Sequence, residues 1–577
     1  MIGLKFIIEV KQKFSYLMDK NSIKKYVLML FFSLISAFLE LIGVTLLLYT
    51  ILAIFEPNFI DKFQFTNYLY HALKIESLKL FILFLTGGLF LLYVIKNIIL
   101  VQISKIQIKN SFEINAQITD DYYRDLVGSD LIYFSSNDST RILNDVIGAT
   151  LNFSESILLS SILFISEWFI VTILFGMVLV FQPWLFLFLF IVLVPTAGLL
   201  IYFNKKSIER ISKQEHELAP KIHENVNYLT RGISSVKLWN RESYFYKNYQ
   251  SVRNQMYDLK SSIYLKSNYI PVRTYEVIAI AGLLCVIIYG IYSGMQIPTI
   301  VAYISIYAAV SFRILPSINR IITSSNNLAS RSHVLDYLIA SKANKEIAKR
   351  QTQLAFNRTI ELSKADFSYP DRDPVLRAVS LQIPKGQFIG FLGSSGSGKS
   401  TLLHIFSSLL PTKNGELKIE GVEIDSSNLT AYRYLFSYVN QDIFMLNESI
   451  LTNISFADDN PNLDKVNTCL KRVNLYRWVD SLPNGIYTSI GELGGKISGG
   501  QRQRIAIARA LYKDSEIFLF DEISNNLDEE SKNEVLKTMQ SLKEEGKTAL
   551  FVTHNKEELK ICDVVYAIEN QQIIEKE

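Results

Sequence analysis

Cysteine is scarce in this chain, which has three cysteines among 577 residues. They form no disulfide framework and show no metal-ligand spacing, so we expect structural roles for Cys285, Cys469 and Cys562. The net charge is also small, because 59 lysines and arginines oppose 55 aspartates and glutamates and leave +4. This balance gives no reason to expect a nucleic-acid partner.

Long apolar runs are absent after residue 330, where the sequence has the pattern of a soluble α/β protein. Before that point six runs occur, at residues 26–55, 78–101, 157–181, 184–203, 275–292 and 298–318. Each is about long enough to cross ~30 Å of hydrocarbon as a helix. We therefore predict an α-helical transmembrane domain of six spans over 1–330, a linker over 331–355 and an α/β domain over 356–577.

The first run is expected to remain as a span, because it follows a basic leader and is too long for the apolar part of a cleavable signal peptide. Basic residues, which collect in cytoplasmic loops, then indicate the orientation. Two lie in 56–77, four in 102–156 and twelve in 204–270. Both termini, the two long loops and the soluble half are thus predicted to be cytoplasmic. The external segment 56–77 is either an interfacial helix on the outer leaflet or an ordered loop packed on the spans.

A phosphate-binding loop follows a strand in the soluble half. The predicted strand 388–392 leads into GSSGSGKS and then into a helical pattern, which is the context that such a loop requires. Glycines let backbone N–H groups approach phosphate oxygens, and the helix N-terminus favours an anion. Lys399 is expected to reach the β- and γ-phosphates of ATP, and Ser400 to bind Mg²⁺. The predicted ATP-binding residues of this loop are Gly393, Ser394, Ser395, Gly396, Ser397, Gly398, Lys399, Ser400 and Thr401.

An acidic pair follows a second apolar strand. Residues 517–520 are typical of a buried parallel strand, which delivers Asp521 and Glu522 to its carboxyl end, where open α/β sheets bind ligands. We predict that Asp521 holds the Mg²⁺ shell and that Glu522 orients and deprotonates the attacking water. Acidic pairs also occur as ordinary caps, and the phosphate-binding loop is what favours catalysis here. We therefore expect ATP hydrolysis with Mg²⁺ as cofactor.

Further motifs between 356 and 577 resemble those of ATP-binding-cassette (ABC) proteins. ISGGQ at 497–501 is similar to the LSGGQ signature of that family, with Ile for Leu, and the order of the motifs is highly specific to it. This chain has NNLD where the family more commonly has SALD, and THN where it has AHR. Neither difference removes a group that the chemistry needs. The resemblance implies an adenine-stacking Tyr369, a Q-loop Gln441 that also binds Mg²⁺, a signature contact from Ser498, Gly499, Gly500 and Gln501, a D-loop Asp528 and a switch His554 at the γ-phosphate.

One set of these motifs after six predicted spans resembles a half-transporter of the ABC exporter type. In that family the signature motif completes the ATP site of the opposite subunit, so the resemblance implies a homodimer with two equivalent sites, and a heterodimer stays open. Segments 125–146 and 224–245 look like the exporter loops that carry the short cytoplasmic coupling helices. They are equally typical of charged helical extensions of the spans.

Four cations lie in or beside the predicted spans. At ~1.5 Å per residue, Arg313 and Arg320 lie about 22 Å and 33 Å below the outer face, Lys96 about 27 Å, and Arg273 at the inner boundary. Three interpretations remain open: snorkelling to the inner headgroups, pairing with glutamates of the spans, or a basic lining for an anionic substrate such as a phosphate or pyrophosphate headgroup. The glutamates concerned are Glu40, Glu167 and Glu276.

The region around FRILPSINRIITSSNNL resembles the sixth span of PglK/Wzk-type flippases, ABC proteins that flip polyprenyl-pyrophosphate-linked oligosaccharides across the bacterial inner membrane. The resemblance implies that Lys96, Arg273, Arg313 and Arg320 line the substrate cavity and that 56–77 corresponds to a short external helix of that group. We therefore expect a homodimeric inner-membrane exporter that flips a lipid-linked oligosaccharide to the outer leaflet. Export of lipid A or of hydrophobic drugs is the alternative, and the six spans argue against a soluble, non-transporting ABC ATPase.

Overall fold

The chain forms two compact units. The computed structural model describes residues 14–576 except 15, 56–67, 69, 71–76, 138, 182, 332–333, 336–337, 340–353, 371, 525–526 and 555. The first unit comprises 1–128 and 137–345, and the second comprises 129–136 and 346–577. The division at 345 falls inside the expected linker. Most of that linker and most of the external segment 56–77 lie outside the described residues.

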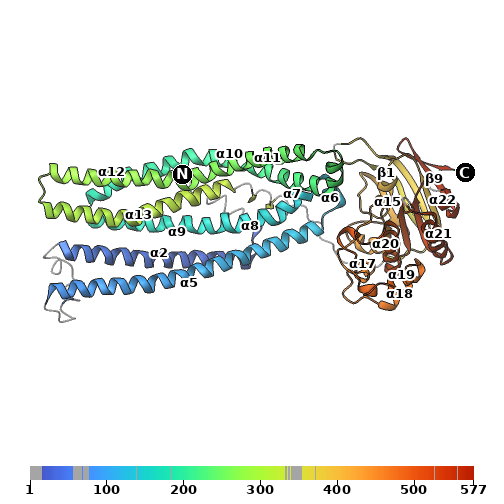
Figure 1. Cartoon of the computed structure of the whole chain (residues 1–577), viewed down its shortest axis with the longest axis horizontal. Coiled ribbons are helices and arrows are strands. Elements are labelled where there is room, and N and C mark those ends of the chain that lie inside the picture. The colour runs from blue at the N-terminus through green and yellow to red at the C-terminus, as the bar shows by residue number, and fades with distance from the viewer. Residues whose placement is uncertain are drawn as a thin grey trace. The chain divides into compact units, whose positions relative to one another are not determined.

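The first unit is helical, and each of the six apolar runs falls in or runs into a long helix (Figure 1). The long helices are α2 (Lys20–Phe55), α5 (Leu78–Val127), α9 (Leu159–Phe181), α10 (Pro183–Leu238), α11 (Glu242–Tyr264), α12 (Ile270–Tyr292) and α13 (Ile297–Ser330). Shorter pieces are α7 (Ser139–Leu143), α8 (Thr150–Asn152) and the π-helical turns η1 (Asn144–Ala149), η2 (Phe153–Leu158) and η3 (Leu265–Tyr269).

Two of these helices are much longer than a membrane is thick. Helix α5 has 50 residues and α10 has 56, and at ~1.5 Å per residue both exceed the ~30 Å of hydrocarbon. Both helices thus extend beyond the length of a membrane crossing, whereas the assignment of 125–146 and 224–245 to coupling helices or to extensions of the spans stays open. Within the described residues four stretches, 20–47, 79–127, 145–176 and 242–292, are long and apolar enough to hold a membrane-crossing helix. The transmembrane character is thus supported, while the number of six crossings stays a prediction.

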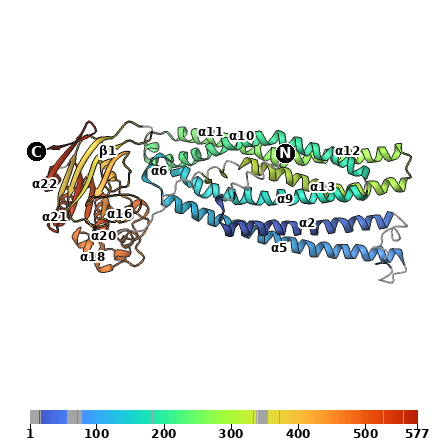
Figure 2. The same cartoon turned by 180° about the vertical axis from the view of Figure 1, so that it is seen from behind.

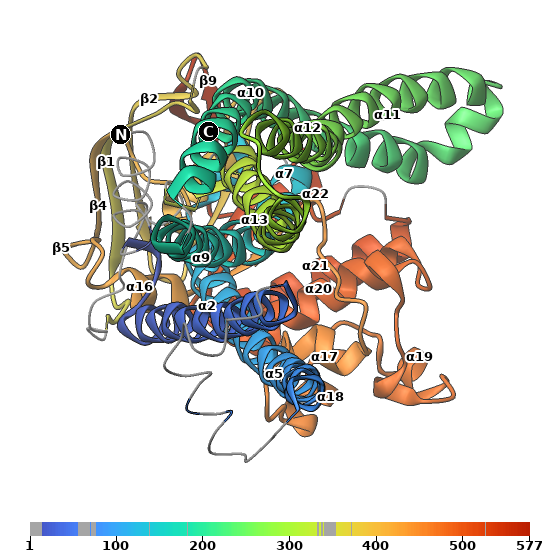
Figure 3. The same ribbon diagram turned by 90° about the vertical axis from the view of Figure 1, so that its left-hand side faces the viewer.

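The helices of the first unit pack as neighbours along their lengths (Figures 1 and 3). Helix α2 lies against α5 and α9, and α13 lies against α9, α10 and α12. Apolar residues such as Leu41, Leu174 and Ile318 fill the space between α2, α9 and α13. This packing brings the polar residues of α2, α5 and α13 together within an otherwise apolar bundle.

The second unit contains two sheets, which Figure 2 shows from behind. Within the described residues the first has strand order β2-β1-β4-β5 and the second β10-β9-β3-β8-β7-β6. The strands are β1 (Thr359–Phe367), β2 (Leu376–Pro384), β3 (Phe388–Leu392), β4 (Asn414–Ile419), β5 (Val422–Glu423), β6 (Phe436–Val439), β7 (Ile517–Asp521), β8 (Thr548–Val552), β9 (Val564–Glu569) and β10 (Gln572–Lys576).

Strand sequence explains the sheets. Strands β3, β7 and β8 read FIGFL, IFLFD and TALFV and are almost entirely buried, as expected for parallel strands covered on both faces. Neighbouring strands from β9 to β6 are parallel, and β10 closes the edge as an antiparallel strand. The first sheet is antiparallel throughout. The carboxyl ends of β3 and β7 therefore lie along the same edge of the sheet, with β8 between them. The predicted ATP site is at this edge.

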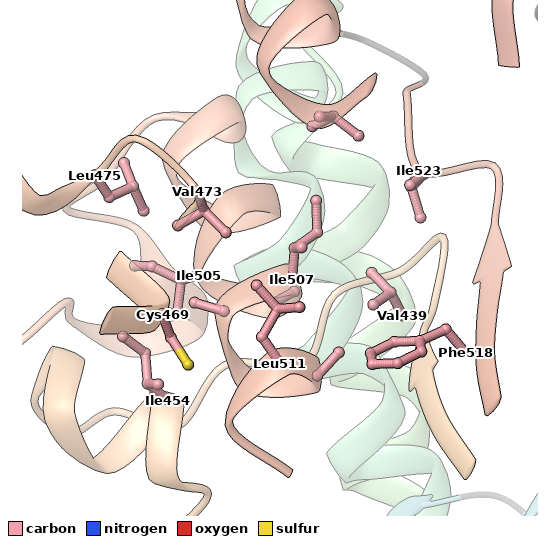
Figure 4. Packing of buried hydrophobic residues seen from close by; sticks show 14 of the residues in the cluster. Val439, Ile454, Cys469, Val473, Leu475, Ile505, Ile507, Leu511, Phe518 and Ile523 are labelled. Carbon is pink, nitrogen blue, oxygen red and sulfur yellow. The ribbon is translucent and has the colours of Figure 1, made fainter. Parts of the chain in front are cut away.

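The second unit also contains helices, of which α15, α16 and α20 contact strands of the large sheet, and α17 and α18 pack on α20. They are α15 (Lys399–Phe406), α16 (Leu429–Tyr434), α17 (Ile450–Ser455), α18 (Leu463–Arg472), α19 (Tyr476–Asp480), α20 (Gly499–Lys513), α21 (Glu529–Glu544) and α22 (Lys556–Ile561), with α6 (Leu131–Ser136) and the 3₁₀ turns η4 (Gly485–Tyr487) and η5 (Glu492–Gly494). Figure 4 shows the core between α20 and the sheet, where Ile507 and Leu511 of α20 face Val439 and Phe518. Leu519, next to Phe518, belongs to the core on the other face.

Candidate functional site

The phosphate-binding loop connects β3 to α15, and its backbone requires glycine at two points. Gly393 has φ +154°, and a Cβ there would lie 2.6 Å from Ser397 Oγ. Gly398 has φ +101°, and a Cβ there would lie 2.7 Å from a Val375 methyl carbon. No other residue fits these positions without displacing a neighbour. The loop sequence is thus fixed by its own close packing as well as by the need to expose N–H groups.

Lys399, at the start of α15, is folded into this loop. Its Nζ donates to the carbonyl oxygens of Gly393 and Ser394, both at 2.9 Å, and the residue is 5% exposed. Burial lowers the pKa of Lys399, and the carboxylates of Glu522 and Asp521 oppose that effect. The ammonium is therefore held at the loop, near the two acidic residues that follow β7.

Asp521 ends β7 and is 4% exposed. Its Oδ2 accepts a hydrogen bond of 3.0 Å from the Tyr438 hydroxyl, whereas Oδ1 is buried and has no hydrogen-bond partner in the described structure. A buried carboxylate oxygen without a donor fits a bound cation. The predicted Mg²⁺ ligands, Ser400, Gln441 and Asp521, supply hydroxyl, amide and carboxylate oxygens, the hard donors that Mg²⁺ prefers. Among the described residues no cluster of three or more His, Cys, Asp or Glu could hold a metal, so a site here depends on this mixed set.

Glu522 lies between two other predicted site residues. Gln441 Nε2 donates to Glu522 Oε2 at 2.7 Å, and His554 Nε2 lies 3.7 Å from Glu522 Oε1. The Glu522 backbone has φ +51°, which a residue with a side chain rarely adopts, and its N–H donates to Val552 O at 2.8 Å. Such strain is typical of functional positions. The carboxylate is thereby aimed away from the strand and held between a glutamine and a histidine, an arrangement that suits a general base.

The signature segment makes a helix cap inside its own chain. Ser498 Oγ accepts from Gln501 N at 3.2 Å, and Gln501 Oε1 accepts from Ser498 N at 2.9 Å, which together form a capping box at the start of α20. Gly500 lies close to Ser531, because a Cβ on it would be 3.2 Å from Ser531 Oγ. The predicted contacts of Ser498, Gly499, Gly500 and Gln501 with nucleotide stay predictions.

Asp528 also caps a helix. Its side chain accepts from Ser531 N at the start of α21, and hydrogen bonds from Ser531 lower the pKa of the Asp528 carboxyl. Tyr369, the predicted adenine-stacking residue, places its hydroxyl 3.3 Å from Thr401 Oγ1 and meets the Phe367 ring edge-on. Tyr369 is therefore next to the phosphate-binding loop, and its contact with adenine stays a prediction.

In the membrane unit a carboxylate and two cations meet between three helices. Lys96 Nζ of α5 lies 2.9 Å from Glu40 Oε2 of α2, and Arg313 Nε of α13 lies 3.7 Å from the same oxygen. We call Glu40, Lys96 and Arg313 the Glu40 cluster. The Lys96 side chain is 5% exposed and that of Arg313 is 11% exposed. Arg313 Nε and Nη2 are buried and make no hydrogen bond in the described structure. Because two cations share one carboxylate, the Glu40 cluster carries one positive charge in excess.

Small and aromatic residues complete the surroundings of the Glu40 cluster. The Lys96 ammonium lies over the Tyr93 ring, 4.2 Å from its centroid, in a cation–π contact. On α2, a Cβ added to Gly43 would lie 3.3 Å from Lys96 Nζ. Glycine at this position therefore leaves room for the ammonium to reach Glu40, one turn earlier on the same helix.

The other two predicted cavity cations are neutralised separately. Arg320 Nη1 of α13 donates to Glu167 Oε1 of α9 at 2.6 Å, and the Glu167 side chain is 3% exposed. Arg273 pairs with Glu276 at 2.7 Å on the same helix, and both side chains are exposed. One of the three interpretations from the sequence is that the cations pair with glutamates of the spans. In the structure each of the four cations contacts such a glutamate, which is Glu40, Glu167 or Glu276. The lining of a substrate cavity by these residues stays a prediction.

Two residues at these sites could not be picked from the sequence. Tyr438 stands three residues before Gln441, and a single aromatic residue in a strand is ordinarily a core residue. Gly43 stands in an apolar run, where a glycine has no distinguishing feature in the sequence. Both residues are identified only by contacts with segments far away in the chain, with Asp521 for Tyr438 and with Lys96 for Gly43.

The fold and the ATP site define an ATP-driven membrane transporter. Residues 26–315 match the family described as the ABC transporter transmembrane region, and residues 376–525 match the family described as ABC transporter. The chain therefore belongs to the ABC transporter family. The predicted combination of a helical transmembrane domain and an ABC ATPase domain is confirmed.

Relatives and structures agree with this assignment. The chain is 29% identical over 395 residues to an ATP-dependent lipid A-core flippase of Saccharophagus degradans, covering 68% of this chain and 66% of that protein, just under two thirds of its length. It is 28% identical over 410 residues to an uncharacterized ABC transporter ATP-binding protein of Bacillus subtilis, covering 70% of each. Its fold is similar to that of a bacterial Atm1-family ABC exporter with ATP bound, with a TM-score of 0.76, 17% identity and coverage of 96% and 94%.

Proposed function

We propose that this protein flips a lipid-linked oligosaccharide, a glycan on polyprenyl pyrophosphate, from the inner to the outer leaflet of the bacterial inner membrane. Two copies form a homodimer, with the ATPase units in the cytoplasm. The proposal rests on the basic-residue distribution along the chain, the family, and the Glu40 cluster.

The Glu40 cluster is the observation that carries the substrate class. Two cations share one carboxylate, and the buried Arg313 guanidinium keeps two nitrogens without hydrogen bonds. A buried cation that is incompletely paired is costly in a membrane unit and marks a functional site. A guanidinium is also suited to bidentate contact with phosphate. An anionic headgroup supplies the missing negative charge, and a hydrophobic drug does not.

Lipid A is a second candidate, because several relatives bear the name ATP-dependent lipid A-core flippase. Both candidates are lipids that carry phosphate groups and sugars on apolar chains, so the Glu40 cluster suits either. Multidrug export is the weaker alternative, since it needs an apolar or aromatic cavity and tolerates loss of the cations.

The ATPase unit supplies the energy. Lys399 and the N–H groups of its loop bind the β- and γ-phosphates, and Ser400, Asp521 and Gln441 hold Mg²⁺. Bound Mg²⁺ neutralises charge on the phosphate oxygens. Glu522 takes the proton of the attacking water while Gln441 and His554 keep its carboxylate in place. The Ser498–Gln501 segment of the second copy completes each site, so that ATP binding closes the two ATPase units and hydrolysis releases them.

ATPase stimulation in lipid nanodiscs tests the substrate class. We expect the wild-type rate to rise several-fold with a polyprenyl-pyrophosphate oligosaccharide, and Arg313→Gln to remove that rise while keeping the basal rate. Arg124→Gln is the matched control, because Arg124 is exposed, is paired with Asp121 within its own helix, and is not among the predicted cavity residues. Stimulation by lipid A alone selects the second candidate, and stimulation by uncharged drugs alone contradicts both.

A further inference from the structure

A tyrosine three residues before the predicted Q-loop glutamine lies beside the predicted Mg²⁺ ligand Asp521. Tyr438 is on β6, which pairs in parallel with β7, and its direct partner in register is Leu519. Side chains two residues apart on a strand share a face, so Asp521 lies on the same face as Leu519 and one step further along. The Tyr438 hydroxyl reaches it and donates to Asp521 Oδ2 at 3.0 Å.

The Tyr438 ring is held in place from the helix that follows the phosphate-binding loop. His404 of α15 meets it edge-on, with ring centroids 5.4 Å apart and planes at 88°. The Tyr438 hydroxyl, which like other tyrosine hydroxyls is protonated at neutral pH, is the donor of this hydrogen bond. Its neighbour Val439 points to the opposite core, shown in Figure 4, so the strand alternates between packing and this polar contact.

We propose that Tyr438 is a positioning residue for the Mg²⁺-binding carboxylate. Its hydrogen bond occupies Oδ2 and fixes the rotation of the carboxylate, which leaves the buried and unpartnered Oδ1 as the oxygen that takes the cation. Hydrogen bonds to metal-binding carboxylates commonly set metal affinity in this way. The inference rests on the proposed Mg²⁺ role of Asp521.

A plain structural role for Tyr438 is the competing explanation, because buried tyrosines usually find some acceptor. Tyr432 provides the matched comparison. It is fully buried, and its hydroxyl donates to Phe406 O at 2.7 Å, away from the predicted Mg²⁺ ligands. Tyr432→Phe and Tyr438→Phe each remove one hydrogen-bonding hydroxyl and keep the ring. Only Tyr438→Phe should alter metal binding.

The experiment measures binding of a fluorescent, non-hydrolysable ATP analogue to the full-length protein in detergent, with EDTA and with saturating Mg²⁺. The ratio of the two dissociation constants reports what the metal contributes. For Tyr438→Phe we expect that ratio to fall ~10-fold or more, in line with changes seen for partners of metal ligands, with the dissociation constant in EDTA unchanged. Tyr432→Phe should keep the wild-type ratio.

The inference is wrong if Tyr438→Phe keeps the wild-type ratio of the two dissociation constants. It is also wrong if that ratio falls equally in Tyr438→Phe and Tyr432→Phe. Asp521→Asn separates this failure from that of the proposed site. If Asp521→Asn loses the Mg²⁺ effect while Tyr438→Phe keeps it, only the role of Tyr438 is wrong. If Asp521→Asn keeps the effect, the assignment of Asp521 as a Mg²⁺ ligand is wrong as well.

Discussion

The Lys96 ammonium lies 2.9 Å from the Glu40 carboxylate inside the membrane unit, and Arg313 shares the same carboxylate oxygen at 3.7 Å. Among the residues that the structure describes, Glu40 is thus the one negative partner of two cations that are almost fully buried. Glu40→Gln removes the negative charge that both cations share. Removing one partner of a buried ion pair lowers the free energy of unfolding by roughly 3–5 kcal/mol. We expect a lower melting temperature in detergent.

Glu276→Gln is the control for that prediction, because the Arg273–Glu276 pair is exposed and such pairs contribute about 0–1 kcal/mol. If Glu40→Gln melts no lower than Glu276→Gln, the Glu40 cluster is not a buried electrostatic unit. Addition of a pyrophosphate lipid should stabilise Glu40→Gln more than wild type, since the anion then replaces the lost carboxylate.

Glu522→Gln should stop hydrolysis and leave ATP binding intact. The amide keeps a contact with Gln441 yet cannot accept the proton of water, and loss of a general base costs about 10²–10⁴-fold in rate. Phosphate release measures the rate, and a thermal shift with ATP measures binding. Glu529→Gln, an exposed residue in the first turn of α21, should hydrolyse ATP at the wild-type rate. A Glu522→Gln rate within tenfold of wild type argues against the assigned role.

The capping box at α20 predicts a stability effect for Ser498. Ser498→Ala removes the side-chain acceptor for Gln501 N and should cost about 1 kcal/mol, whereas Ser498→Thr keeps a hydroxyl. Chemical denaturation of the two variants tests this. Equal stability of Ser498→Ala and wild type would mean that the signature serine has no capping role.

Glu558 on α22 predicts a dependence of stability on pH. It is 1% exposed, and burial raises the pKa of its carboxyl, with weaker opposing effects from Thr553, Ser524 and Lys532. A raised pKa in the folded state gives a contribution that is fully present below the unfolded value near 4.5 and is lost as pH rises through the folded value. As the pH rises from 5 to 8 the wild type loses this contribution, whereas Glu558→Gln has no titrating group at this position.

We expect Glu558→Gln to melt a few degrees higher than wild type at pH 8, since roughly 1 kcal/mol shifts the midpoint by about 2–4 °C for a unit of this size. The difference should shrink toward pH 5. The neighbouring Glu557, whose side chain is exposed and paired with Lys560, is the control position for Glu→Gln. A lower melting temperature for Glu558→Gln at pH 8 contradicts the argument.

Local sequence patterns predicted the elements of the ATPase unit. They could not predict which residues far apart in the chain contact each other. The strand–loop–helix around Lys399 and the acidic end of β7 depend on neighbouring residues, so spacing alone located them. The partner of Lys96 is 56 residues away, and that of Arg320 is 153 residues away. Three glutamates were candidates, and helix packing decides which pairs with which cation. Tyr438 was missed for the same reason, because its acceptor lies on another strand.

Flipping itself is the most direct test of the central claim. Proteoliposomes would hold a labelled polyprenyl-pyrophosphate oligosaccharide, and its ATP-dependent arrival in the opposite leaflet would be measured for wild type, Glu522→Gln and Arg313→Ala/Arg320→Ala. We expect wild type to flip the lipid, Glu522→Gln not to flip it, and the arginine variant to hydrolyse ATP without flipping. A wild-type protein that hydrolyses ATP and leaves this lipid in place would contradict the account and favour lipid A or drug export.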